Sequence, residues 1–449
     1  MIKKLFLLLA TSFVTICANA QVIDTTNYFG GKKPDPEVNV IAPPQDDENI
    51  AKDDIIKKGL SFGPLPIVAY DQDRGFEYGA LLNIYNFGDG SWYPTPQSTW
   101  YFEISRYTKG SQLYVVSYDN RVLIPGVRIS AAINVVKEKA LDFYGFNGYE
   151  SYYDVEMPTA FYRLERLVPT FKVDFMGKIK ENLYWKVGYH FSWFDINNFE
   201  SETLNETPTL FELYKSWGII PEEDADGGFS SAIRFGIMYD SRDFEAAPSR
   251  GIWAEIHTVF APEFLGTSHG YTKLNFTFRH YVPIVNSKLV FAYRLNYQGF
   301  VGSAPFYVIP YSTIVGPGYD RDGFGGYHTV RGIMRDRIQG MGVGFYNAEL
   351  RWRFLNFHVA KQNVTLALSG FTDGAKVLKG VDMSTIPTSY IAEYNKYINS
   401  NGDNFHLTAG GGFRIIINQN FIIAAEYGKA FNNQDHSKGA LYINTGFLF

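Results

Sequence analysis

The sequence predicts an all-β protein: a 16-stranded antiparallel transmembrane β-barrel with a long connection between strands 11 and 12. From about residue 60 to the end, apolar and polar residues alternate in segments of roughly ten residues separated by Gly, Asn, Asp and Pro. Sixteen such segments can be counted, and the connections between them alternate between short and long. An even number of long strands suits a closed barrel, in which every backbone amide finds a partner and no edge remains.

The composition excludes a disordered protein and a nucleic-acid-binding protein. Aromatic residues make up 17% and charged residues 19% of the 449 residues, so there is ample apolar surface to bury. The 41 Lys and Arg residues are outnumbered by 46 Asp and Glu residues, without a basic stripe, and we expect no nucleic-acid partner. Beyond the N-terminal segment, no run reaches the ~18 apolar residues that a membrane helix requires.

Residues 1–20 have the pattern of a secretory signal peptide. Two lysines precede an apolar run, and Ala18-Asn19-Ala20 forms a small-residue cleavage site. Cys17 raises the alternative of a lipoprotein signal, but Ile16 stands where such a signal usually has a small residue. Ordinary cleavage is therefore the favoured interpretation.

Residues 21–59 predict a flexible, acidic, proline-containing periplasmic arm, because they lack apolar periodicity. The barrel is expected over residues 60–449. Its strands are predicted to start near residues 64, 74, 97, 110, 126, 165, 182, 229, 250, 269, 287, 343, 364, 405, 419 and 438.

The segment Thr272–Val282 shows the alternation well, with Leu274 and Phe276 on one face and Lys273 and Asn275 on the other. A soluble β-sandwich gives the same alternation, so strand number and loop length decide between the two folds. Short connections are expected at residues 181–182, 285–287 and 418–420, and long ones at 195–228, 302–342 and 373–404. Outer-membrane barrels have short periplasmic turns and long external loops.

Val330-Arg331-Gly332-Ile333, deep in the long connection after strand 11, resembles the lumen-inserted sixth loop of the Omp85 superfamily. The usual motif of that family ends in Phe or Tyr, where this chain has Ile333. Further resemblances follow in the family's order: Gly344–Arg351 to its twelfth strand and Gly370–Gly374 to its thirteenth-strand motif. Asp240–Gly251 resembles a periplasmic turn in the middle of these barrels.

This resemblance covers residues 60–449 and implies a BamA/TamA-like barrel of the bacterial surface antigen D15 type. It places the chain in the outer membrane of a Gram-negative-type bacterium, with outer-membrane lipid around it.

Alternation places the carboxylates of Glu349 and Asp373 on the inward face, where the forked donors of Arg331 can bridge them. The resemblance implies that the loop arginine pairs with the inward aspartate. The expected loop latch in the lumen consists of Arg331, Gly332, Glu349, Asp373 and Gly374. Two interpretations stay open: a latch whose loop position controls the lumen or the lateral seam, and a static plug held by ordinary lumen electrostatics.

The last predicted strand, Leu441–Phe449, looks like the C-terminal signal by which such barrels are recognised for membrane assembly. Phe447 and Phe449 are its expected signal residues. His190, His257 and His406 fall on predicted inward faces, but neither a nucleophile–base order nor metal-ligand spacing organises them. We therefore expect no catalytic residue, no metal, no cofactor and no enzyme activity.

Omp85 proteins ordinarily carry periplasmic POTRA modules before the barrel, and residues 21–59 are too few to form one. The expected function is therefore that of a POTRA-less member that takes part in outer-membrane protein assembly or translocation as an accessory. An outer-membrane assembly machine or client barrel proteins would be its partners. The alternatives are a passive or gated outer-membrane pore and a structural subunit of a membrane complex.

Overall fold

The computed structural model describes residues 56–71, 75–93, 95–204, 207–311, 323–359, 362–384, 386–399, 401–418, 421–435, 438–445 and 447–449. The predicted signal peptide over residues 1–20 lies outside the described residues, as does all but the end of the arm predicted over residues 21–59.

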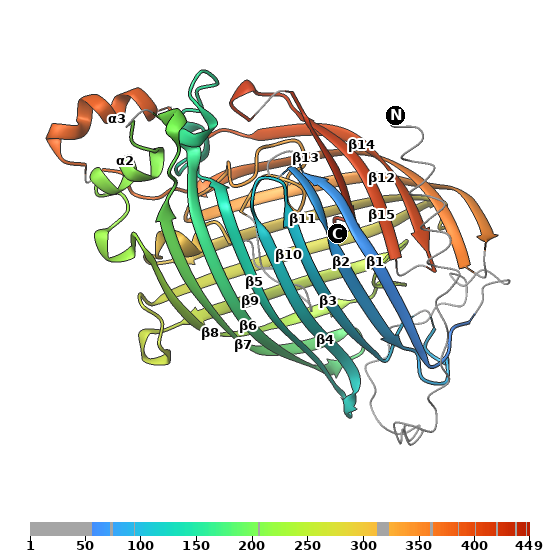
Figure 1. The fold of residues 1–449 in the computed structure, drawn as a ribbon. Helices are drawn as coiled ribbons and strands as arrows, with labels where there is room; N and C mark the ends of the chain where they lie inside the picture. The colour runs from blue at the N-terminus through green and yellow to red at the C-terminus, as the bar shows by residue number, and fades with distance from the viewer. Residues whose placement is uncertain are drawn as a thin grey trace.

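Within the described residues the chain forms sixteen antiparallel strands in a closed barrel, which confirms the predicted fold class (Figure 1). Each strand pairs with its neighbours in sequence, and β1 meets β16 to close the ring. The largest difference from the predicted starts is at β1, expected near residue 64 and found at Leu60. The strands are β1 (Leu60–Asp71), β2 (Gly75–Asn86), β3 (Ser98–Tyr107), β4 (Gln112–Ile124), β5 (Val127–Asp142), β6 (Arg163–Lys180), β7 (Leu183–Asn198), β8 (Gly227–Asp240), β9 (Gly251–Ala261), β10 (Tyr271–Val285), β11 (Leu289–Val301), β12 (Gly342–Val359), β13 (Gln362–Lys379), β14 (His406–Ile417), β15 (Phe421–Ala430) and β16 (Ala440–Thr445).

The two ends of the barrel differ in the length of their connections. Residues 125–126, 181–182 and 286–288 form tight turns at the short-turn end, whereas residues 143–162, 199–226, 302–341 and 380–405 connect strands at the long-loop end. No helix in the described ranges is long and apolar enough to cross a membrane. The helices are α2 (Leu210–Ser216) and α3 (Ile391–Tyr397), with 3₁₀ turns η2 (Gly148–Glu150), η3 (Thr159–Tyr162), η4 (Glu202–Leu204), η5 (Glu222–Asp224), η6 (Glu263–Leu265), η7 (Phe306–Val308), η8 (Thr388–Tyr390) and η9 (Asn433–Asp435).

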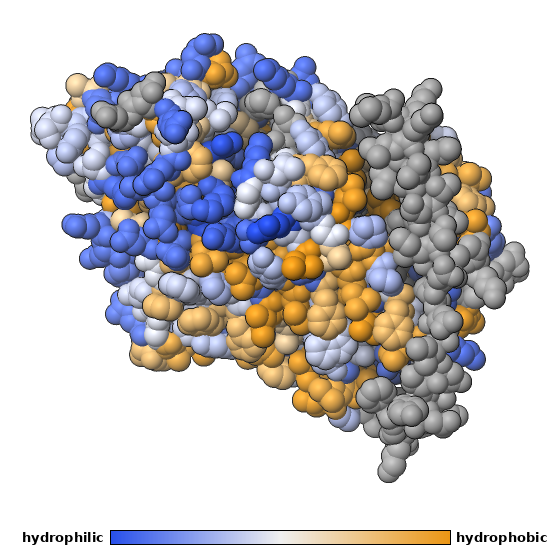
Figure 2. Space-filling model, in the orientation of Figure 1, coloured by the Kyte–Doolittle hydropathy of each residue, from blue (hydrophilic) through white to orange (hydrophobic). Residues whose placement is uncertain are grey.

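The outer face of the barrel is apolar and its inner face is polar. Outward side chains such as Ile104, Ile133 and Leu295 are exposed, whereas the inward charges of Lys172 and Arg234 are buried. Figure 2 shows apolar residues gathered over the strands and hydrophilic residues over the long loops. This arrangement is the one that a barrel surrounded by lipid requires.

The long loops pack together into an apolar cluster that the alternation did not predict. Phe143 contacts Tyr214 edge-on, with ring centroids 5.3 Å apart, and the fully buried Trp217 donates its indole N–H to Glu393 at 3.0 Å. Phe306 and Ile398 extend the same cluster into two further loops. The long-loop end therefore has a hydrophobic core of its own.

A buried polar junction joins the connections after β5, β13 and β15 to the start of β14. The imidazole of His406 lies between Asp435 (Nδ1 to Oδ1, 2.8 Å) and Asp403 (Nε2 to Oδ1, 3.0 Å). The ring of Tyr149 stacks on His406 with centroids 3.9 Å apart. Asp403 also accepts the backbone N–H groups of Tyr149 (2.9 Å) and Val377 (2.8 Å). Burial by itself raises the pKa of Asp403, but these hydrogen bonds and His406 lower it below its usual value of 3.8.

We expect this junction to weaken at acidic pH. Because the folded-state pKa of Asp403 lies below 3.8, its contribution is complete above pH 3.8 and is lost as the pH falls through the folded value. Hydrogen exchange at the amides of Tyr149 and Val377, corrected for intrinsic rates, should show local opening becoming easier by about 1–3 kcal/mol. The Asp403→Asn variant should show the easier opening at all pH values. An equal acid response in both proteins would contradict the assignment.

Candidate functional site

The described part of the connection between β11 and β12, residues 323–341, forms a compact loop against the inner wall. Gly326 N–H donates to the carbonyl of Ile333 (2.9 Å), and Ile338 N–H donates to the carbonyl of Phe324 (3.0 Å). The hairpin presents an apolar side to β12, β13 and β15. That cluster comprises Phe324, Val330, Ile333, Ile338, Val343, Phe345, Ala375, Val377 and Ala430.

Arg331 lies at the tip of this loop and binds Asp373 of β13 with both ends of its guanidinium. Nε donates to Oδ2 at 2.8 Å and Nη2 donates to Oδ1 at 3.0 Å. The backbone N–H of Arg331 donates to Oδ2 as well, at 3.0 Å. Such forked pairing fixes the orientation of the guanidinium as well as its position.

Two further carboxylates complete the surroundings of Arg331. Its Nη1 donates to Glu426 Oε1 of β15 at 2.6 Å and lies 3.4 Å from Glu349 Oε2 of β12. The guanidinium carbon stands 3.5 Å from the centre of the Phe371 ring, and the side chains of the three ion-pair partners are fully buried. Burial alone would lower the pKa of Arg331, but the three carboxylates raise it well above its ordinary value. Arg331 is therefore a charged side chain with no solvent-accessible surface.

Gly332 brings the loop backbone directly against β15. Its φ is 92°, and a Cβ there would lie 2.6 Å from the carbonyl carbon of Gly428. A Cβ on Gly428 would in turn lie 2.9 Å from the carbonyl carbon of Arg331. Gly332 N–H also donates to the hydroxyl of Tyr442 on β16, at 3.1 Å. The contact therefore requires glycine on both sides.

Gly374 does not belong to this cluster. A Cβ at Gly374 would point to the ring of Tyr346 (2.5 Å) and to Leu407 (2.9 Å), which both lie on the outer side of the wall. The space beside Gly374 is filled by the ring of Tyr346 rather than by the loop.

Two arginines extend the network toward the short-turn end. Arg414 Nη2 lies 2.7 Å from Glu349 Oε1 and 2.6 Å from Glu426 Oε1, and Arg351 Nε lies 3.6 Å from Glu349 Oε1. Arg331 therefore shares its two glutamates with side chains of β12 and β14.

The predicted C-terminal strand is shorter than expected. It was predicted over Leu441–Phe449, but β16 ends at Thr445. The rings of Phe447 and Phe449 lie instead against Arg351, at 4.3 and 4.8 Å from its guanidinium carbon. Attraction between the rings and the buried cation accounts for the difference.

Other side chains fasten the loop along its length. Arg335 Nη1 donates to Glu138 Oε1 of β5 at 2.6 Å. Arg337 donates to the carbonyls of Gly148 (2.8 Å) and Ser151 (2.9 Å) in the loop after β5. The loop is thus tied to the wall and to the long-loop end.

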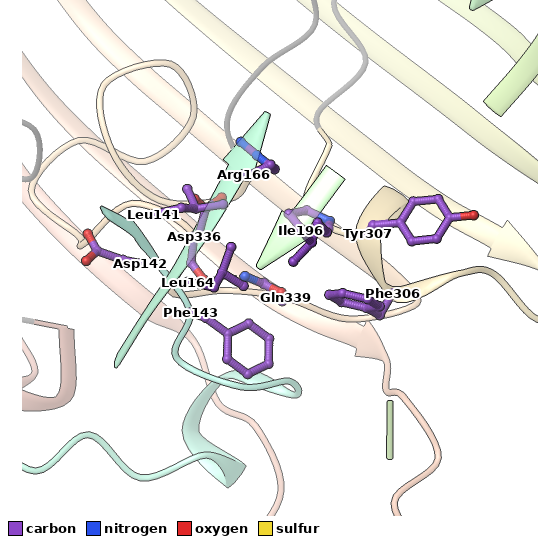
Figure 3. A pocket seen from close by; sticks show the side chains of 11 residues that line it. Leu141, Asp142, Phe143, Leu164, Arg166, Ile196, Phe306, Tyr307, Asp336 and Gln339 are labelled. Carbon is purple, nitrogen blue, oxygen red and sulfur yellow. Dashed lines mark hydrogen bonds between the residues drawn. The ribbon is translucent and has the colours of Figure 1, made fainter. Parts of the chain in front are cut away.

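A pocket lies where the loop meets β5, β6 and β7 (Figure 3). Arg166, Asp336 and Gln339 reach it from the wall and the loop, and aromatic side chains such as Phe143 and Phe306 surround them. The lining is mostly apolar and offers no nucleophile with a base beside it. We read the pocket as space between the loop and the wall.

No three His, Cys, Asp or Glu side chains gather as a metal site in the described part of the chain. The inward histidines are instead held by neighbouring carboxylates. His257 Nδ1 lies 2.8 Å from Glu255 and His190 Nε2 lies 3.2 Å from Asp174.

The structure thus brings together Arg331, Gly332, Glu349 and Asp373 of the predicted latch and leaves Gly374 outside. Sequence reasoning missed Glu426 as a partner of Arg331 and Gly428 as the contact of Gly332. Alternation along a strand indicates which face a residue occupies but carries no signal for this pairing, because Arg331 and Glu426 are 95 positions apart in the sequence.

Replacing Arg331 with alanine should destabilise the barrel by about 3–5 kcal/mol, because it leaves buried carboxylates without their central cation. Urea unfolding of the purified protein in lipid vesicles would measure the loss. Lys139→Ala is the matched control. It breaks the half-exposed pair with Glu165 (3.4 Å) and should cost less than about 1 kcal/mol.

Adding Asp373→Asn to Arg331→Ala should recover part of the stability, because it removes one of the unpaired charges. Equal urea midpoints of unfolding for the Arg331→Ala and Lys139→Ala variants would contradict the role given to this network.

Comparison with known proteins supports the barrel fold. Residues 102–449 match the family model of the Omp85 superfamily domain. BamA from Haemophilus ducreyi lacking POTRA domains 1-3 is similar in structure, with a TM-score of 0.53 and 17% identity over 87% of this chain and 70% of that chain. CdiB from Escherichia coli gives a TM-score of 0.54 and 11% identity over 93% of this chain and 68% of that chain.

At these identities the structural likeness shows a shared fold. A comparison with curated protein sequences gives no match. Because the family model matches most of the chain, and because the barrel has the fold of BamA and CdiB, this protein belongs to the Omp85 superfamily.

Proposed function

We propose that this protein takes part in outer-membrane protein assembly or translocation in a Gram-negative-type bacterium. The observation that carries the proposal is the seam between β1 and β16. In the described residues the register joins these strands at a single pair, Tyr70 with Ile443. On its other side, β1 pairs with β2 over its whole length, from Leu60 to Asp71.

Two features of the seam explain its sparse pairing. β16 is short, and β1 contains Pro64 and Pro66, which have no N–H to donate. A strand edge without a partner is costly in lipid and serves as a template for another strand. A client strand that pairs with this edge would satisfy it, which is what assembly of a membrane barrel requires.

The loop network lies next to this seam. Besides the hydrogen bond from Gly332 to Tyr442 of β16, the ring of Tyr327 lies 5.7 Å from that of Tyr442. A change in the position of the loop would therefore break these contacts with Tyr442 of β16. This proximity supports the latch interpretation over the static plug.

The likeness to BamA and CdiB supports assembly or translocation more than a passive pore. The loop and the chain end pack against the inner wall, so conduction would require their displacement. We also propose that the role is non-enzymatic and that client proteins are the partners. The narrower accessory role stays a prediction from the sequence.

Locking the seam tests the proposal. Cysteines at Tyr70 and Ile443, which face each other in an antiparallel pair, lie within disulfide range. The only natural cysteine is Cys17, in the predicted signal peptide. In a host depleted of the native protein, the oxidised Tyr70→Cys/Ile443→Cys variant should fail to restore the outer-membrane proteome, whereas either single variant should restore it.

A reductant should rescue the locked variant. If depletion leaves the outer-membrane proteome unchanged, the proposal is wrong. If the locked variant restores it fully, the seam is not the working element.

A further inference from the structure

Basic side chains form a row on the outer wall where β3, β4 and β5 reach the long-loop end. Arg106 of β3 lies opposite Gln112 of β4, and Gln112 lies opposite Lys137 of β5. Arg106 is in phase with Ile104, which is 56% exposed. Lys137 is in phase with Ile133, which is 59% exposed, so the row points away from the lumen. Neighbouring strands lie about 4.8 Å apart, which places the backbones of the two cationic residues roughly 10 Å from each other.

The row is made of hydrogen-bond donors. Guanidinium and ammonium groups can only donate. Gln112 accepts the hydroxyl of Tyr114 at its Oε1 (2.9 Å), which leaves the amide N–H groups of Gln112 to donate. In the described part of the chain, Arg106 and Lys137 make no ion pair and no side-chain hydrogen bond. Such a row suits a ligand that is negatively charged and rich in acceptors, as a phosphate group is.

Two further cations stand beside the row. Lys109, in the turn between β3 and β4, is exposed, as is Lys139 of β5. Lys139 lies next to that turn, because a Cβ on Gly110 would stand 3.1 Å from the Cβ of Lys139. Glu165 of β6 pairs with Lys139 at 3.4 Å, so cations outnumber carboxylates by four to one in this group. We call Arg106, Lys109, Gln112, Lys137 and Lys139 the basic patch.

The outward side chains next to the basic patch, toward the middle of the wall, are apolar or aromatic. The first row consists of Ile104, Tyr114 and Val135 on β3, β4 and β5. The second row consists of Phe102, Val116 and Ile133 on the same strands. In a barrel surrounded by lipid, charged groups directly beside an apolar wall mark the boundary between headgroups and acyl chains.

The height of the patch on the wall agrees with such a boundary. Tyr78 of β2 lies opposite Arg106 and is 49% exposed, and aromatic residues are enriched at the headgroup level of membrane barrels. β2, β3 and β4 form the front of the barrel in Figure 1, and Figure 2 shows hydrophilic residues bordering the apolar band on that face. Outer-membrane barrels carry their long loops outside the cell, so the patch belongs to the outer leaflet.

We propose that the basic patch binds the phosphate groups of a lipid headgroup in the outer leaflet, while the acyl chains of that lipid lie on the two apolar rows. The forked N–H groups of Arg106 suit phosphate oxygens, and Lys137 binds the same headgroup from the other side of Gln112. The apolar rows favour a lipid over a free phosphate ion, because only a lipid also covers them. The site requires a barrel in a membrane and does not depend on the proposed role in assembly.

Lipid binding to the full-length protein tests the site. The probe is lipid A, a glucosamine disaccharide that carries two phosphate groups and several acyl chains, added to the protein in a neutral detergent. Native mass spectrometry then measures the fraction of protein that retains a lipid molecule at each lipid concentration. The Arg106→Gln/Lys137→Gln variant should bind lipid A about thirtyfold more weakly than the wild type, because it lacks two of the four cations.

The matched control removes two lysines elsewhere on the barrel. Lys376 of β13 and Lys429 of β15 lie on the outer face at the same end. The Lys376→Gln/Lys429→Gln variant should bind lipid A as the wild type does. Lipid A from which both phosphates have been removed should bind the wild type at least about thirtyfold more weakly. Inorganic phosphate should weaken lipid binding no more than sodium chloride does at the same ionic strength.

Heat-modifiable electrophoretic mobility shows whether each variant is a folded barrel. If the Arg106→Gln/Lys137→Gln variant does not fold, Lys137→Gln alone should weaken binding about fivefold. Equal affinities of the wild type and a folded patch variant, or equal binding of lipid A with and without its phosphates, would overturn the proposal. Specific displacement of lipid A by inorganic phosphate would assign the patch to a free ion and would overturn it as well. None of these results depends on the outer-membrane proteome, so the proposed function is tested separately.

Discussion

The burial of one positive charge, on Arg331, is the constraint on which the rest of the lumen depends. Its guanidinium is fully buried, so the cost of removing the charge from bulk water must be offset by Asp373, Glu349 and Glu426. These carboxylates come from three strands, β12, β13 and β15. A buried ion pair adds little net stability compared with an apolar contact of similar volume. Its hydrogen bonds are directional, however, so Arg331 can satisfy them in few positions of the loop. The network therefore specifies where the loop sits.

The same network links the loop to the tail of the chain, residues 447–449. Glu349 and Glu426 also bind Arg414, which holds the ring of Phe447, so the loop and the tail share two carboxylates. The glycine contact between loop and β15 adds a steric constraint, because neither Gly332 nor Gly428 has room for a Cβ. Loop, wall and tail behave as one unit for this reason.

Much of the fold could be predicted because the period-two pattern is local. It located sixteen strands and placed Glu349 and Asp373 on the inward face, whereas the pairing of Arg331 with Asp373 was implied by the resemblance to the Omp85 loop motif. The partnership of Arg331 with Glu426 could not be predicted, since alternation gives a face and not a contact. The apolar cluster around Trp217 arises from loops far apart in sequence. The pattern also continued β16 to Phe449, where buried arginines and two prolines on the neighbouring strand override it.

The link between the loop arginine and the tail can be measured directly. Leu448→Cys introduces a thiol between the two aromatic rings, and Cys17 lies in the predicted signal peptide. The rate of maleimide labelling at position 448 should be low with Arg331 present and should rise at least about tenfold in the Arg331→Met background, because the shared glutamates lose their central cation. Equal labelling rates in two folded proteins would show that the loop does not hold the tail, and the network would then be a static plug.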